Sequence, residues 1–374
     1  MNKTKVLYIT NGVSGVGGLE RVLALKASYL ADNMNYEVHI MTLNQKGEEP
    51  FYHFSKSIYF HDIAALGNAV KYTYLYIKRV LETVKEVNPD VISVCDDGLK
   101  GFTLPVLLKH KYLIVYERHV STQIERNDKN RSGLKKVIVT FKLLLMNFLG
   151  RYFNKFVVLT NGSLSEWKLK NLAVIPNPLS FYPAGRSSLN RKKIIAVGKQ
   201  SYQKGYDHLL KAWKIVCDEH PDWELNIYGK IAPELVLDVL ASQLGISNRV
   251  KFYEPVKNIQ EKYMESSIYV LSSRFEGFGM VLIEAMACGV PCVSFNCPFG
   301  PSDIIQDGYN GFLVENGNIN ELAGKICKVI EDEKLRRDLG YNAKEYVQIF
   351  KSEVVVKMWD DLFKSLIYAN RLSN

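Results

Sequence analysis

The sequence predicts an α/β protein built from two doubly wound halves, and two observations carry this prediction. Short runs rich in Val and Ile alternate with stretches of helical spacing, and the alternation restarts after residue 193. Apolar strands that alternate with helices are typical of parallel sheets covered on both faces. At 374 residues the chain is long enough for two such domains.

The first half contains six expected strands, at 5–10, 37–43, 57–63, 90–95, 111–117 and 155–160. Helices are expected after the glycine-rich turn near residue 15, up to about residue 87, and from about 131 to 152. This half forms a first domain over residues 1–178.

The second half contains expected strands at 194–198, 223–229, 250–255, 267–273, 291–295 and 311–315, with helices near 204–219, 232–244 and 280–288. A segment with three prolines, 176–193, indicates a linker. The second domain therefore spans 191–351, and we expect the helical tail 352–374 to pack back on the first domain.

Composition and charge limit the function classes. The first 180 residues hold 24 Lys and Arg against 15 Asp and Glu, so the whole net charge of +9 lies there. Such an excess favours an anionic partner: a membrane surface, phosphates or a nucleic acid. No nucleic-acid-binding motif accompanies the charge, so nucleic acid is disfavoured. The six cysteines form no C-x-x-C pair, no secretory leader or spanning run is evident, and we expect a cytoplasmic protein.

A glycine-rich turn, NGVSGVGGLER (11–21), follows the first strand. Glycines allow a close backbone approach, and a helix N-terminus favours an anion. In a dinucleotide fingerprint that starts at Gly15, the third glycine would fall on Glu20, and no acid follows the second strand. A phosphate-facing or substrate-facing loop is therefore favoured over dinucleotide binding, and a ligand-free tight turn stays possible.

Two lysines, Lys199 and Lys204, follow the first strand of the second domain in VGKQSYQKGYD (197–207). A parallel sheet binds ligands at this end of its strands, and a diphosphate suits two ammonium groups. The alternative is that both lysines are solvated.

The run RFEGFGMVLIEAMACGVP (274–291) places one acid before a helix and a second about one turn inside it. Unpaired buried carboxylates are costly, but hydroxyl donors of a sugar and a ribose would keep Glu276 and Glu284 ionised. Phosphates would lie between them at the helix N-terminus. The alternative is a helix cap for Glu276 and a salt bridge for Glu284.

At these motifs the chain resembles the family 4 retaining glycosyltransferases, which have the GT-B fold of two Rossmann-like domains facing each other across a cleft. The resemblance spans nearly the whole chain. It is carried by GGLER (17–21), VIPNP (174–178), VGKQSYQKGYD, EGFGMVLIE (276–284) and GPSDIIQDGYNGFLV (300–314).

The resemblance implies that Glu276 contacts hydroxyls of the donor sugar and that Glu284 holds the ribose. It also implies a catalytic role for Glu276, Lys199, Lys204 and His119. The implied donor-binding residues are Gly17, Gly18, Val256, Gly277, Phe278, Gly279, Met280, Val281 and Glu284.

Three positions depart from the family pattern or align loosely with it. Lys199 stands where relatives usually have Arg, so it lacks the planar fork for bidentate phosphate contact. Asp303 replaces Glu in a block associated with transferases that build bacterial surface polysaccharides. His119 lies in YERHVS (116–121) and is either turned toward the donor sugar or an ordinary loop histidine.

The implied reaction moves a sugar from a nucleotide diphosphate to a hydroxyl with retention at the anomeric carbon. The leaving phosphate takes the acceptor proton in such enzymes, so no protein base is assigned. No D-x-D triplet is present, and we expect no metal and no cofactor. A UDP-sugar is the favoured donor, with GDP-mannose second. An oxidoreductase, a GT-B nucleotide-sugar epimerase and a non-catalytic sensor are the other classes.

The apolar stretch 134–156 carries interspersed bases: Lys135, Lys136, Lys142, Arg151 and Lys155. With the positive first half, it favours peripheral contact with an anionic membrane, where a lipid-linked acceptor would lie. A core helix between two strands is the alternative, and the stretch could serve both roles.

Overall fold

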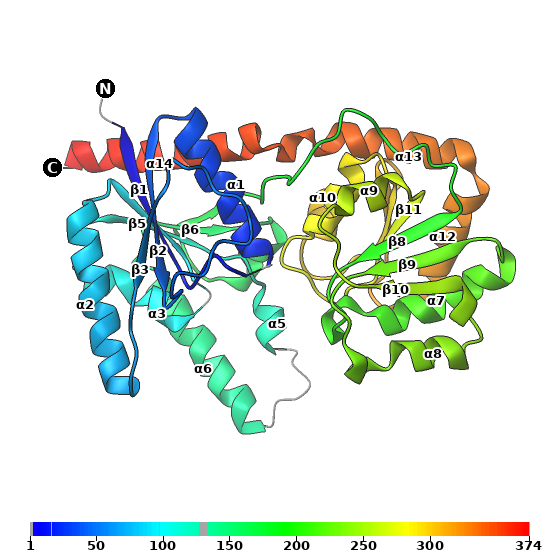
Figure 1. Cartoon of the computed structure of the whole chain (residues 1–374), viewed down its shortest axis with the longest axis horizontal. Coiled ribbons are helices and arrows are strands. Elements are labelled where there is room, and N and C mark those ends of the chain that lie inside the picture. The colour runs from blue at the N-terminus through cyan, green and yellow to red at the C-terminus, as the bar shows by residue number, and fades with distance from the viewer. Residues whose placement is uncertain (1–2, 16, 97, 127–132, 374) are drawn as a thin grey trace. The chain divides into compact units, whose positions relative to one another are not determined.

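The computed structural model describes residues 3–15, 17–96, 98–126 and 133–373, and the chain divides into two compact units (Figure 1). Unit 1 comprises Met1–Ser180 and Ser352–Asn374, and unit 2 comprises Phe181–Lys351. Each unit contains a parallel sheet, so the prediction of two Rossmann-like α/β domains is confirmed.

In the described residues, unit 1 has a seven-stranded sheet in the order β3-β2-β1-β4-β5-β6-β7. The strands are β1 (Thr4–Thr10), β2 (Tyr36–Leu43), β3 (Tyr59–Ile63), β4 (Val91–Cys95), β5 (Leu113–Glu117), β6 (Lys155–Val158) and β7 (Leu172–Val174). The register places Val6 opposite both Val38 and Val91, all fully buried. Strand β7 was not predicted, because three residues are too few to show a strand period.

Helices cover both faces of this sheet. One face is packed by α2 (Ala69–Val87), α3 (Leu99–Phe102), α4 (Leu104–Leu107) and α6 (Gly133–Gly150), and the short helices α5 (Thr122–Arg126) and η1 (Gly162–Glu166) lie in the same unit. The opposite face is packed by α1 (Gly18–Asn33) and α14 (Ser352–Ser373). Arg131 and Ser132, where the third helix was expected to begin, lie outside the described residues.

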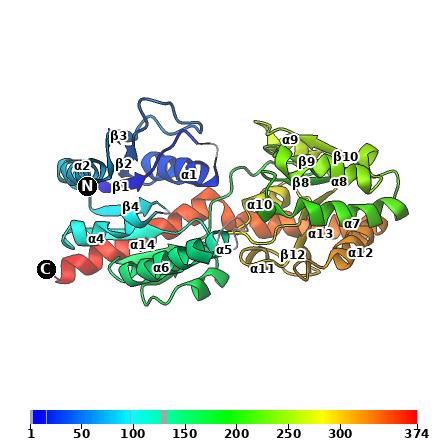
Figure 2. The ribbon, with the colours of Figure 1, turned by 90° about the horizontal axis from the view of Figure 1, so that it is seen from below.

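The C-terminal helix α14 packs against α1 (Figures 1 and 2). Its side chains Val355, Val356 and Phe363 are fully buried in the core of unit 1. The hydroxyl of Tyr36 on β2 donates to Asp360 at 2.8 Å. The last element of the chain is therefore part of the first unit. No helix in the described part of the chain has the length and apolar content needed to cross a bilayer.

Unit 2 has a six-stranded sheet in the described residues, in the order β10-β9-β8-β11-β12-β13. The strands are β8 (Lys193–Val197), β9 (Glu224–Tyr228), β10 (Val250–Tyr253), β11 (Ile268–Leu271), β12 (Cys292–Phe295) and β13 (Gly311–Val314). In both sheets the strand order reverses beside the first strand, between β1 and β4 and between β8 and β11. Open α/β sheets bind ligands at this reversal, beyond the carboxyl ends of the strands.

The main core of unit 2 lies between its sheet and α7 (Tyr206–Glu219), α8 (Leu237–Gln243) and α12 (Ile319–Glu331). Helix α10 (Met280–Ala287) packs with α9 (Ile259–Met264), α11 (Pro301–Ile304), α13 (Glu333–Tyr346) and η5 (Val347–Phe350). Short turns η2 (Tyr202–Lys204), η3 (Pro233–Leu235) and η4 (Ser247–Arg249) complete the unit.

The proline-containing segment predicted as a linker is tied to unit 2 over much of its length. The backbone N–H of Ser187 donates to the carbonyl of Cys288 at 2.8 Å, and its hydroxyl donates to the carbonyl of Ser266 at 2.7 Å. The ammonium of Lys344 donates to the carbonyl of Pro183 at 2.7 Å. The structure accordingly divides the chain after Ser180.

Candidate active site

In unit 2, the loops that follow β8 and β11 are bonded to each other at the reversal of strand order. The backbone N–H of Arg274 donates to the carbonyl of Gln203 at 2.8 Å. The Ser272 hydroxyl donates to the carbonyl of Lys204 at 2.9 Å, and the Gln203 amide donates to the carbonyl of Phe275 at 3.1 Å. Residues 68 to 72 positions apart in the chain are therefore held side by side.

Glycine at position 205 makes this close approach possible. Gly205 has a φ of +62°, and a Cβ atom there would lie 2.2 Å from the carbonyl oxygen of Ser272. Any larger residue would push the two loops apart.

The side chain of Arg274 also links the same two loops. Its guanidinium donates to both carboxylate oxygens of Asp207, at 2.9 and 2.6 Å, and to the carbonyl of Tyr202 at 2.7 Å. Burial raises the pKa of Asp207, but the hydrogen bonds and charge of Arg274 outweigh burial and lower that pKa below its ordinary value. The bidentate pair fixes the start of α7, directly after Lys204.

Lys204 and Glu276 meet at the centre of this arrangement. The ammonium of Lys204 lies 2.7 Å from Oε1 of Glu276, and the Ser273 hydroxyl donates to the same oxygen at 2.5 Å. Within the described residues no hydrogen bond reaches Oε2 of Glu276, although the residue is only 6% exposed. One carboxylate oxygen is thus held by the protein, and the other can accept a hydrogen bond from a ligand hydroxyl.

Helix α10 begins beside this pair. Gly279, with a φ of +98°, is its N-cap residue and offers no side chain to the first-turn N–H groups. The alternative expectation was that Glu276 caps the N-terminus of α10. Glu276 is instead hydrogen-bonded to Lys204 and Ser273. The positive end of a helix next to an ammonium group favours an anion such as a phosphate.

Glu284 lies inside α10 and is 1% exposed. The hydroxyl of Tyr263 on α9 donates to its Oε2 at 3.4 Å. The same helix that presents its N-terminus at the strand ends therefore also carries the second acid of the motif.

The other unit 2 residues singled out in the sequence lie on the same loops or after neighbouring strands. Lys199 is exposed after β8, and Val256 is 37% exposed after β10. Phe278 is buried, with its ring edge-on to Phe350 at 5.6 Å. Gly277, Met280 and Val281 are half-buried around the start of α10.

Unit 1 has its own polar cluster at the carboxyl ends of β4 and β5. Glu117 is 1% exposed; its Oε1 accepts from the Ser93 hydroxyl at 2.5 Å and its Oε2 pairs with the ammonium of Lys26. Nε2 of His119 lies 3.2 Å from that same Oε2. Burial alone would raise the pKa of Glu117, but Lys26 and His119 lower it to about 2.

The glycine-rich turn of unit 1 lies at the same strand ends. The side-chain amide of Asn11 donates to Asp96, directly after β4, at 3.0 Å. Gly17 and Gly18 are exposed at the start of α1, and Val16 lies outside the described residues. These glycines and His119 were predicted from the sequence, whereas Lys26, Ser93 and Glu117 were not. A lysine within the apolar run LALKASYL was the available signal.

In the described part of the chain, two groups of side chains have the chemistry of metal ligands. Cys95, Glu117 and His119 have ligand atoms within 4.8 Å of one another, but the Lys26 ammonium pairs with Glu117 and opposes a cation there. A second group, Glu219, His220 and Cys327, lies at the end of α7 and on α12. The expectation of a metal-independent reaction stays a prediction.

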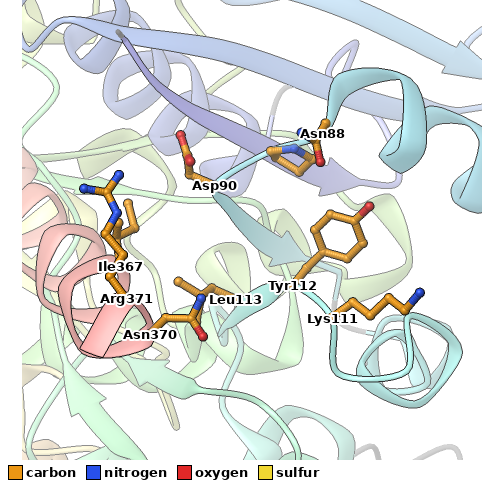
Figure 3. A pocket seen from close by; sticks show the side chains of 9 residues that line it. Asn88, Asp90, Lys111, Tyr112, Leu113, Ile367, Asn370 and Arg371 are labelled. Atoms are coloured by element: carbon orange, nitrogen blue, oxygen red, sulfur yellow. The ribbon is translucent and has the colours of Figure 1, made fainter. Parts of the chain in front are cut away.

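A cavity of about 240 Å³ lies at the opposite edge of the unit 1 sheet, where β4 and β5 begin (Figure 3). Its lining comes from the segments before β4 and β5, the first residue of β5 and the end of α14, and comprises Asn88, Pro89, Asp90, Lys111, Tyr112, Leu113, Ile367, Asn370 and Arg371. Asp90 already accepts the backbone N–H of Lys5 at 2.8 Å. Because ligands of such sheets bind at the carboxyl edge, this cavity is not the candidate site.

The chain is similar to several known proteins in sequence and in fold. Residues 183–346 match the family model described as glycosyl transferases group 1. An uncharacterized glycosyltransferase of Haemophilus influenzae is 30% identical over 361 residues, covering 95% of this chain and 98% of the relative. The amylovoran biosynthesis glycosyltransferase AmsD of Erwinia amylovora is 27% identical over 374 residues, covering 96% and 99%.

Among solved structures, the Anabaena protein HepE in complex with UDP and glucose superposes with a TM-score of 0.77. The match covers 97% of this chain and 100% of that chain at 20% identity. At this identity the likeness shows a shared fold.

Proposed function

Because the chain belongs to the glycosyl transferases group 1 family, we propose that it is a family 4 retaining glycosyltransferase. It moves a hexose or N-acetylhexosamine from a nucleotide diphosphate sugar to a hydroxyl acceptor. The observation that carries this proposal is the Lys204–Glu276 pair at the N-terminus of α10, with Oε2 of Glu276 left for a ligand.

Each part of such a donor has a matching group in unit 2. Sugar hydroxyls donate to Glu276, and ribose hydroxyls donate to Glu284. Negative charge grows on the leaving diphosphate as the sugar–phosphate bond stretches. Lys204, the exposed Lys199 and the N-terminus of α10 stabilise that charge, and such preorganised electrostatic stabilisation is usually the largest contribution to catalysis. The leaving phosphate accepts the proton of the acceptor hydroxyl, so the proposed mechanism needs no protein base. We propose that the reaction also needs no metal.

A UDP-sugar is the proposed donor, with GDP-mannose as the alternative. The structure of HepE with UDP and glucose, a protein that shares this fold, supports the first choice. We propose bacterial surface polysaccharide synthesis, such as capsule or O-antigen, as the setting, with a lipid-linked or saccharide acceptor. The full-length similarity to the amylovoran biosynthesis glycosyltransferase supports this setting.

We also propose that the protein works in the cytoplasm, on the inner face of the cell membrane, and that α6 touches the lipid. Val139, Leu143 and Met146 bury one face of α6 in the core of unit 1. The helix is therefore a core helix, but a second face is apolar and exposed. That face carries Val137, Ile138, Phe141, Leu144 and Phe148, between 47% and 67% exposed.

Basic side chains lie beside this exposed stripe. Lys136 is exposed on α6, and the guanidinium of Arg151 lies 4.3 Å above the ring of Phe148. The side chain of Lys135 lies outside the described residues. Apolar side chains flanked by bases on one helix are typical of helices that lie in the interface of an anionic bilayer.

The proposed function is tested by nucleotide release from a panel of UDP- and GDP-sugars, with and without lipid-linked acceptors. We expect turnover with one class of donor, and a fall of about 100-fold or more in kcat for Glu276→Gln and Glu284→Gln. Full activity in both variants would contradict the assignment.

Further measurements distinguish this function from an epimerase, a sensor and a metal-dependent transferase. A GT-B epimerase would release free sugar without any acceptor, and a sensor would bind donor without turnover. Adding EDTA should leave the rate unchanged, and a strict metal requirement would count against this mechanism.

A further inference from the structure

The buried carboxylate of Glu117 contacts both His119 and buried polar side chains of unit 1. It receives three hydrogen bonds or ion pairs: Ser93 on Oε1, and Lys26 and His119 on Oε2. Lys26 comes from α1, Ser93 from β4, and Glu117 ends β5, so three elements converge on one carboxylate.

The charge state of Glu117 determines which nitrogen of His119 carries a proton. Lys26 is 1% exposed, and its ammonium also lies 4.0 Å above the ring of Trp359 on α14. This buried cation keeps Glu117 ionised. An ionised carboxylate only accepts hydrogen bonds, so Nε2 of His119 must be the N–H donor.

The second ring nitrogen of His119 has no hydrogen-bond partner among the residues that the structure describes. Nδ1 is buried and makes no hydrogen bond with any described residue, and the side chain is 8% exposed. With a proton on Nε2, Nδ1 of the neutral ring is an acceptor. Buried polar atoms nearly always have a partner, so an unpaired acceptor at the carboxyl edge of the sheet calls for a donor from a ligand.

We propose that Glu117 is a positioning residue: it fixes His119 in the Nε2–H form, so that Nδ1 accepts a hydrogen bond from a substrate hydroxyl. Lys26 and Ser93 hold Glu117 in turn. This inference rests on the proposed function for the identity of the substrate, a sugar-bearing donor or acceptor. A buried ion pair is seldom more stabilising than packed apolar side chains, which favours a role beyond stability for this one.

The form of the histidine ring can be measured without any substrate. Protein labelled with ¹⁵N only in histidine is examined by long-range ¹H–¹⁵N NMR, and the signals of His119 are assigned from their loss in His119→Ala. The wild type should show a protonated Nε2 and an unprotonated Nδ1. In Glu117→Gln the new amide group can donate to Nε2, so the Nδ1–H form should appear.

Ser93→Ala is the matched control, because it removes one hydrogen bond to the same carboxylate but leaves the bond to His119. It should keep the wild-type signals. A protonated Nδ1 in neutral wild-type His119, or the same signals in wild type and Glu117→Gln, would overturn the proposal.

Kinetics then distinguish positioning from a general structural role. Glu117→Gln should lower kcat/KM by about 100-fold, the scale expected for a misplaced catalytic group. In a His119→Ala background the same substitution should cause no further fall, because its effect passes through His119. Independent, multiplicative losses would overturn the proposal. Separate KM values for donor and acceptor show which substrate supplies the hydroxyl.

Folding of the variants needs its own check, since Glu117→Gln leaves Lys26 buried without its anion. The double variant Lys26→Met/Glu117→Gln removes both charges and should show the same loss of activity and the same change in His119. If the wild type turns over no donor at all, the proposed function fails, while the NMR result still decides the form of His119.

Discussion

Single glycines decide how closely the loops of the candidate site can approach. Gly300 has a φ of +113°, and a Cβ atom there would lie 2.0 Å from the carbonyl oxygen of Phe278, in the turn that starts α10. This turn also follows Glu276, whose backbone N–H donates to the carbonyl of Pro298 at 2.7 Å. The geometry of the site therefore depends on the absence of a side chain at position 300.

Gly300→Ala should lower the free energy of unfolding by about 3 kcal/mol or more, because overlap with a backbone atom adds to the strain of a positive φ. Gly308→Ala is the control: its φ is +75°, but a Cβ atom there meets nothing within 4 Å. It should lose only about 1–2 kcal/mol. Denaturant unfolding measures both, and equal losses would mean that close packing against Phe278 is unimportant.

The paired charges in unit 1 predict a dependence of stability on pH. The pKa of Glu117 is lowered from 4.5 to about 2 in the folded chain. Its contribution to stability is therefore complete above pH 4.5 and is lost as the pH falls toward 2. The double variant Lys26→Met/Glu117→Gln should lose less stability than the wild type across this range in urea unfolding. If the free energy of unfolding falls equally with pH in both proteins, the Lys26–Glu117 pair does not contribute to this pH dependence.

At the scale of an element, α6 has two apolar faces with different surroundings. One packs on the sheet of unit 1, and the other is the exposed stripe that begins at Val137. A core helix normally presents a polar outer face, so the outer stripe requires a second apolar environment.

Phe141→Glu should reduce sedimentation with vesicles of phosphatidylglycerol by about tenfold or more, because it removes an apolar contact and adds a charge repelled by the lipid. Val239→Glu on α8 of unit 2, at a site 46% exposed, is the matched control and should bind as the wild type does. Equal binding of all three proteins would contradict a lipid contact at α6.

At the scale of the whole chain, unit 1 is completed by its last element. Trp359 and Phe363 of α14 are at most 3% exposed, and Trp359 covers the buried ammonium of Lys26. Unit 1 thus needs both ends of the chain, whereas unit 2 is continuous in sequence.

Removing residues 352–374 should lower the melting temperature of unit 1 strongly, because it uncovers the core side chains under α14. Removing only residues 368–374 should change it little, since Tyr368 and Leu372 are 67% and 71% exposed. Calorimetry of the two truncated chains compares them, and similar melting would show that α14 does not complete the core.

Much of the fold follows from local patterns. All six strands expected in the first half exist. Five of them are the mostly buried apolar runs typical of parallel strands, whereas β3 is an exposed strand at the sheet edge. The three-residue β7 lacks such a pattern. In the site, Lys204 and Glu276 could be placed at one sheet edge because both follow strands of a parallel sheet. The pairing of Lys26 with Glu117 could not, since 91 residues separate them and nothing local links a helix lysine to a strand-end acid.

The sequence by itself determined the α/β class, the two sheets, the glycine-rich turns and the two acids around α10, because each depends on residue type and spacing within a short window. The tertiary structure decided which charges meet, which oxygen of Glu276 stays available, and which face of α6 is covered. Those features depend on distances between elements far apart in the chain, and they exist only once the sheets have formed.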